Sequence, residues 1–232
     1  MPEGRDRPEA RRAAAVSREI RTPRAAAVAG LVFSALLIVA LLLLDAAIGA
    51  KPHPYHGWLT DETHREAVLV ALGLIPFAAI AFLWFIGVVR DYLGDREDRF
   101  FATVFLGSGL LFLAMMLAAA ALGGGLVATA HQNSALAASG VWDLSRRATN
   151  TLMHTYAMRM AAVFMISSAT LLLRTGLAPR WLALAGYAIA AVLLIAVATI
   201  VYVALLFPVW VGLVSLYILR RSRDRASRGV AR

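Results

Sequence analysis

The sequence predicts an all-α fold, a polytopic membrane helical bundle with six transmembrane helices and both termini in the cytoplasm. Of the 232 residues, 60% are hydrophobic. Several apolar runs approach or exceed about 18 residues with at most one charge, which is the length that crosses the hydrocarbon core of a bilayer. The net charge is +9, and most of the arginines lie in the two tails and beside the apolar runs. That distribution is typical of membrane topology and not of a nucleic-acid interface.

We divide the chain into a transmembrane domain and two tails. Residues 1–24 form a basic cytoplasmic tail that we expect to be partly disordered, residues 25–220 form the transmembrane domain, and residues 221–232 form a second basic cytoplasmic tail. The spans are predicted at about 26–48, 67–89, 101–122, 151–173, 182–201 and 203–219. The first apolar run is longer than the hydrophobic region of a typical signal peptide, so we interpret it as a retained helix.

The last two predicted spans share one apolar stretch, residues 181–219, that contains no polar loop. As one straight helix this stretch would be about 58 Å long, about twice the hydrocarbon thickness. With six spans, eighteen of the 23 basic residues fall on one side of the membrane and four on the other. With five spans the arginine-rich C-terminal tail would lie outside, against the positive-inside rule. We therefore predict a tight apolar hairpin near residues 199–202.

The connection between the third and fourth spans is expected to begin at the glycines 123–125 and to run to about residue 150. Loops of this length are often functional or carry a helix of their own. Residues 134–147 are compatible with a short interfacial helix in which Trp142 and Leu144 dip into lipid.

Two charged residues, Asp45 and Arg159, lie inside predicted spans, where ionisable groups are costly and suggest a functional site. Arg159 lies about 12 Å below the outer end of its span by helix rise, and its long side chain can reach upward. We hypothesise that Asp45 and Arg159 form a pair and, with Thr155 and Tyr156, line a ligand or ion pathway. Thr151, Thr155 and Arg159 step by four along one face, which is expected to face the bundle interior. The alternative is a structural salt bridge, or two side chains that reach the interface.

A metal site is a further hypothesis, formed by His53, His56 and His64 or by His154 with Met158. His53 and His56 approach within about 7 Å in a β-turn but lie about 9 Å apart in a polyproline helix. Thioether with imidazole suits Cu(I), whereas methionine also fills gaps in packed helices. We expect no cofactor, with copper or zinc as the alternative. The chain has no cysteine, which excludes thiolate ligands, disulfides and cysteine nucleophiles.

The segments "RTPRAAAVAGLVFS", "FLWFIGVVRDYLGDREDRFFATVFLGSG" and "LFPVWVGLVSLYILRR" resemble a family of small, uncharacterised multi-pass membrane proteins of actinobacteria. The resemblance covers most of the chain. It implies six helices and lends no catalytic residue, substrate or activity. Arginine supplies 22 of the 23 basic residues, a usage typical of a GC-rich bacterial genome, and we expect a multi-pass protein of the bacterial inner (plasma) membrane.

The expected function follows from short loops, the lack of a catalytic motif and small-residue helix faces suited to association. We expect a non-enzymatic accessory or scaffold protein whose partners are membrane lipid and other membrane proteins or a second copy of itself, with no nucleic acid. One alternative is a small transporter or channel with an outward-half polar site around Asp45 and Arg159. Another is an outer-face metal-binding membrane protein.

Overall fold

The computed structural model describes residues 6–48, 62–93, 99–132, 140–176, 178–196 and 201–230. All the regular structure in these ranges is helical, which confirms the predicted fold class. The elements, in chain order, are α1 (Asp6–Ile48), α3 (Glu62–Leu93), α4 (Arg99–Gln132), α6 (Gly140–Thr151), a π-helical segment (Leu152–Ala157), α7 (Met158–Thr175), α8 (Arg180–Ala196), a 3₁₀ helix (Val201–Leu205) and α9 (Leu206–Val230).

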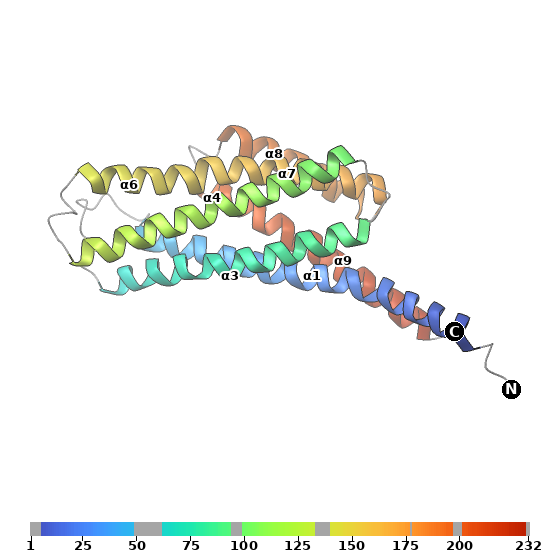
Figure 1. The fold of residues 1–232 in the computed structure, drawn as a ribbon. Coiled ribbons are helices and arrows are strands. Elements are labelled where there is room, and N and C mark those ends of the chain that lie inside the picture. The colour runs from blue at the N-terminus through green and yellow to red at the C-terminus, as the bar shows by residue number, and fades with distance from the viewer. Residues whose placement is uncertain are drawn as a thin grey trace.

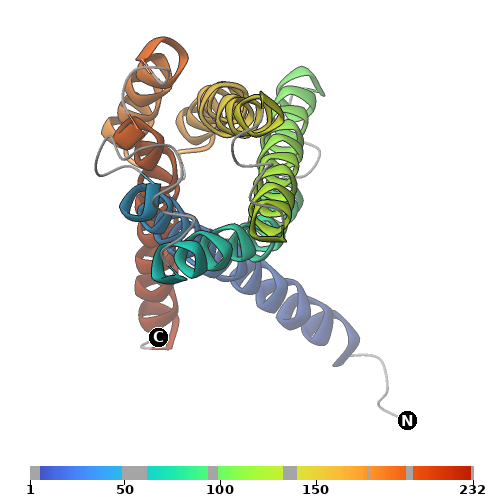
Figure 2. The same ribbon diagram turned by 90° about the vertical axis from the view of Figure 1, so that its left-hand side faces the viewer.

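The helices form one bundle in which each packs against its neighbours around a common axis. The packing order is α1, α3, α4, α7, α8 and α9, and α9 returns to α1 to close the ring. Figure 1 shows the long helices running lengthwise, with the start of α1 and the end of α9 at the same end of the bundle. Figure 2 shows the bundle from its other end, where α6 lies beside α4.

Five helical segments are long and apolar enough to cross a membrane. They are Arg24–Ala46, Glu62–Arg90, Thr103–Thr129, Gly140–Thr175 and Tyr202–Arg223. The remaining apolar helix, α8, has 17 residues, which corresponds to about 25 Å of helix and is slightly shorter than the hydrocarbon core. In the described residues, the apolar stretch 181–219 contains α8, the 3₁₀ helix and the start of α9. Pro208 lies in the first turn of α9, where a helix tolerates the missing N–H.

Two helices extend beyond the limits expected from the sequence. Helix α1 begins at Asp6, inside the basic tail that we expected to be partly disordered. Helix α4 continues through the three glycines to Gln132, where we expected a loop. A Cβ at Gly123 would lie 3.2 Å from the Thr149 methyl group and 3.4 Å from Leu72. Glycine here allows α4 to approach α6 and α3 closely, which is the common use of small residues in membrane helices.

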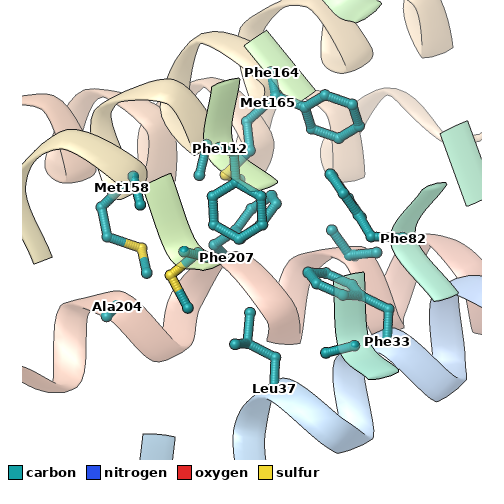
Figure 3. Close-up of a cluster of buried hydrophobic side chains, with 14 of the residues drawn as sticks. Phe33, Leu37, Phe82, Phe112, Met158, Phe164, Met165, Ala204 and Phe207 are labelled. Carbon is teal, nitrogen blue, oxygen red and sulfur yellow. The ribbon is translucent and has the colours of Figure 1, made fainter. Parts of the chain in front are cut away.

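The centre of the bundle is a cluster of five phenylalanines, one from each of five helices. Its members are Phe33 (α1), Phe82 (α3), Phe112 (α4), Phe164 (α7) and Phe207 (α9), and Figure 3 shows them together with Met158 and Met165. Phe82 is the hub of the cluster, with ring centroids 4.4 to 5.9 Å from the other four. Several pairs are edge-to-face, the geometry that aromatic quadrupoles favour.

Helix α8 is held against the bundle by specific contacts on both sides. Trp210 of α9 donates its indole N–H to the carbonyl oxygen of Leu182 at 3.0 Å, and the same ring covers Gly186. On the other side, the hydroxyl groups of Tyr187 and Thr170 are 2.6 Å apart. These contacts place α8 between α7 and α9.

Hydrogen bonds also tie the end of the bundle that carries the chain termini. Helix α7 ends at Gly176, whose φ of 61° is the left-handed conformation that glycine adopts without strain. Arg221 of α9 donates to the Gly176 carbonyl at 2.8 Å, and Arg24 of α1 donates to the Ser222 carbonyl at 3.3 Å. Arg221 thus binds a carbonyl group at the end of α7 that has no partner within the helix, and Arg24 links α1 to α9.

Candidate functional site

The bundle contains an open-sided cavity of about 230 Å³ at the end opposite the chain termini. We call this cavity the distal pocket. Its walls include apolar side chains such as Leu41, Leu72, Val127 and Met153. Its polar lining residues are Asp45, Arg146, Thr149, Asn150, His154 and Tyr202. A few polar groups on mostly apolar walls are the usual composition of a small-molecule site.

Three polar side chains from distant parts of the chain meet at one side of the distal pocket. Asp45 is half-buried near the end of α1, and the Tyr202 hydroxyl of the 3₁₀ helix lies within hydrogen-bonding reach of its carboxylate. His154, in the π-helical segment, is close enough to Asp45 for its charge to act on the imidazole. We call these three residues the cluster around Asp45.

The other polar lining residues follow one face of α6. Arg146 and Asn150 are spaced by four residues, the spacing that places side chains on one side of an α-helix, and His154 follows in the π-helical segment. Trp142 lies one turn earlier on the same face and is 1% exposed. The structure thus buries Trp142 in the lining of the distal pocket. This differs from the expectation that Trp142 dips into lipid from a separate interfacial helix.

Two buried polar atoms on this face lack a hydrogen-bond partner among the residues that the structure describes. They are Oγ1 of Thr149 and Nδ1 of His154. The imidazole lies near the carbonyl of Asn150 one turn back, but the two do not meet in hydrogen-bonding geometry. Because buried polar atoms are almost always paired, these two mark where a bound molecule or water would donate or accept.

Among the described residues no salt bridge joins Asp45 to Arg159, and the π-helical segment lies directly before the turn that carries Arg159. The i→i+5 hydrogen bonds of a π-helix give it more residues per turn than an α-helix has. Thr151, Thr155 and Arg159, which are four residues apart, therefore do not lie on one face of this segment. Arg159 and Tyr156 are exposed, and Thr155 is half-buried. None of the three lines the distal pocket, and the structure brings Asp45 together with Tyr202 and His154 instead.

Two further hydroxyl groups of α7 donate hydrogen bonds within their own helix. Ser167 donates to the carbonyl of Val163 at 3.1 Å, and Thr170 donates to the carbonyl of Ile166 at 2.9 Å. Such bonds to the preceding turn satisfy hydroxyl groups in membrane helices without a ligand.

The metal candidates are only partly inside the described part of the chain. His53 and His56 lie outside it, and His64 is exposed in the first turn of α3. His154 lines the distal pocket, whereas Met158 is fully buried in the phenylalanine cluster. Within the described ranges no group of three or more histidine, cysteine, aspartate or glutamate side chains is arranged to hold a metal ion.

Sequence reasoning found Asp45 and His154 but missed Tyr202, Arg146, Thr149 and Asn150 as lining residues. One signal was available within α6, because Trp142, Arg146 and Asn150 are spaced by steps of four. No comparable signal existed for Tyr202, which reaches Asp45 only through the turn before α9. Comparison of the chain with protein-family models, curated proteins and solved structures found no match.

Proposed function

We propose that this chain is a six-pass protein of the bacterial inner membrane, with cytoplasmic termini, whose distal pocket binds a small amphipathic molecule. Binding of this kind is the recognition step of a carrier or a receptor. The observation that carries the proposal is the distal pocket itself, in which polar side chains from four elements converge between apolar walls. The transporter alternative from the sequence is thereby revised, with Asp45, His154 and Tyr202 in place of Arg159.

The size of the pocket supports a small ligand. A cavity of about 150 Å³ holds a benzene molecule, so 230 Å³ gives room for a ring and a short polar arm. Apolar walls would hold the ring, and Thr149 and His154 offer polar atoms that lack partners among the described residues.

Six passes are supported by the course of the chain after α7. Tyr202 approaches Asp45 near the end of α1, so α8 leads back toward the distal end before α9 begins. In this arrangement eighteen basic residues also lie on the cytoplasmic side and four on the outer side, as the positive-inside rule requires.

Cysteine labelling tests the topology, because the chain has no cysteine of its own. Asp143 and Arg223 are exposed near opposite ends of the bundle. In right-side-out vesicles we expect a membrane-impermeant maleimide to label Asp143→Cys directly and Arg223→Cys only after permeabilisation. Labelling of both positions from the same side would contradict six passes, because it would require α8 and α9 to make a single crossing.

A titration with 2-phenylethanol tests the binding proposal. Trp142 lines the distal pocket and is buried there, so an occupant should alter its fluorescence. In lipid nanodiscs we expect a saturable fluorescence change that is lost in Trp142→Phe. A change that grows linearly with probe concentration and persists in Trp142→Phe would report partition into lipid and overturn the proposal.

The accessory or scaffold role stays a prediction from the sequence. Unlike the binding proposal, this role requires a stable protein partner in the membrane. Purification from native membranes with a stoichiometric partner, together with no binding in the titration, would favour that role.

A further inference from the structure

We propose that the group recognised in the distal pocket is an ammonium, held by the carboxylate of Asp45 beside the ring of Tyr202. This inference rests on the proposed function, because it names the chemistry of the molecule that the pocket binds. Both an apolar amine and an apolar amino acid carry this group, and the test below separates them.

The distal pocket carries a negative charge that a bound cation would compensate. Among the described residues that line the distal pocket, Asp45 is the one carboxylate. It is half-buried in the last turns of a helix that is otherwise uncharged from Ala25 onward, and a carboxylate in such surroundings is costly unless a cation or hydrogen bonds compensate it. The Tyr202 hydroxyl lies within hydrogen-bonding reach of it. An ionised carboxylate accepts several hydrogen bonds, so it retains the capacity to bind an ammonium group.

The surroundings of Asp45 favour an organic cation over a metal ion. The described residues bring no second carboxylate and no group of three metal-ligating side chains to this site. Tyr202, which is 62% exposed, instead brings its phenol hydroxyl to the carboxylate, and Leu41 and Leu44 extend the apolar wall. A carboxylate beside an aromatic ring is an arrangement that recognises ammonium groups, through ion pairing and cation–π attraction.

The second charged residue of the pocket stands apart from the first. Arg146 precedes His154 by eight residues, which is about 12 Å of helix rise, while His154 belongs to the cluster around Asp45. The pocket is therefore acidic on one side and basic on the other. An amine would use the acidic side alone, and an amino acid would add a carboxylate directed toward Arg146.

Four water-soluble probes with the same phenyl ring test this inference by calorimetry in lipid nanodiscs. Phenethylamine carries the ammonium, 2-phenylethanol replaces it with a hydroxyl, 3-phenylpropionate carries only a carboxylate, and phenylalanine carries both charges. We expect phenethylamine or phenylalanine to bind about tenfold or more tightly than 2-phenylethanol. Phenylalanine in first place would identify an amino acid, and phenethylamine in first place an amine.

Substitutions assign the effect to Asp45. We expect Asp45→Asn to weaken binding of the ammonium probes by about tenfold or more and to weaken 2-phenylethanol binding far less. Saturable 2-phenylethanol binding also shows that the variant is folded and retains the pocket. Asp143→Asn is the matched control, since Asp143 is exposed on α6 outside the pocket, and it should bind all four probes like the wild type.

The outcomes separate the two proposals. Equal binding of phenethylamine and 2-phenylethanol, unaffected by Asp45→Asn, would overturn the ammonium inference and leave the binding pocket standing. Preferential binding of 3-phenylpropionate would also overturn it and point to Arg146. Failure of all four probes to bind beyond empty nanodiscs would overturn the proposed function together with this inference.

Discussion

Phe82→Ala should destabilise the protein by about 3 kcal/mol, because it removes the hub of the phenylalanine cluster. Phe82 is fully buried, and its ring contacts phenylalanines from four other helices. In a membrane the lipid is as apolar as the core, so the loss comes from the cavity and the missing packing contacts rather than from exposure to water. The expected cost therefore lies near the lower end of the range for this substitution in soluble cores. Reversible unfolding in mixed micelles measures it.

Phe77→Ala is the matched control on the same helix. Phe77 is 63% exposed and faces outward from α3, so its removal leaves no internal cavity. We expect a change within about 0.5 kcal/mol. Equal losses for the two variants would contradict the assignment of Phe82 to the centre of the bundle.

Gly186→Leu should detach α8 from α9 and cost about 3 kcal/mol or more in unfolding free energy. A Cβ at Gly186 would lie 2.8 and 2.9 Å from two carbon atoms of the Trp210 indole. That ring cannot simply turn away, because its N–H is bonded to the Leu182 carbonyl at 3.0 Å. We expect the substitution to break this hydrogen bond and to displace Trp210, which a change in its fluorescence and the same unfolding assay would report.

Gly87→Leu provides the comparison. No atom lies within 4 Å of a Cβ placed at Gly87, so the larger side chain has open space beside α3. We expect it to unfold within about 0.5 kcal/mol of the wild type. A Gly186→Leu protein as stable as Gly87→Leu would rule out the close contact between α8 and α9.

The helices were predictable because long apolar runs carry a strong signal. The all-α fold is confirmed, and five segments have the length and composition of membrane spans. The limits of the helices were less predictable. The three glycines at 123–125 break a helix in water, where they cost conformational entropy. Here Gly123 instead lets α4 approach Thr149 and Leu72, a tertiary contact that local sequence does not reveal.

The candidate site was only half predictable. Asp45 was identified as a charge inside a span, and it does line the distal pocket. Its partner was not identified, because the assumed α-helical spacing fails in the π-helical segment that carries His154. The sequence has no clear mark for a π-helical turn, since the turn depends on how the helix packs against its neighbours. Tyr202 was missed because a turn in the described chain, and not helix periodicity, brings it to Asp45.

The central claim is that the distal pocket binds a small molecule, and a variant that fills the pocket tests it most directly. Thr149 lines the pocket, whereas Thr129 is exposed on α4 outside it. The measurement is the Trp142 fluorescence titration with 2-phenylethanol in nanodiscs, made in parallel on wild type, Thr149→Phe and Thr129→Phe. The account predicts saturable binding for wild type and Thr129→Phe and none for Thr149→Phe. The same saturation curve for all three proteins would contradict it.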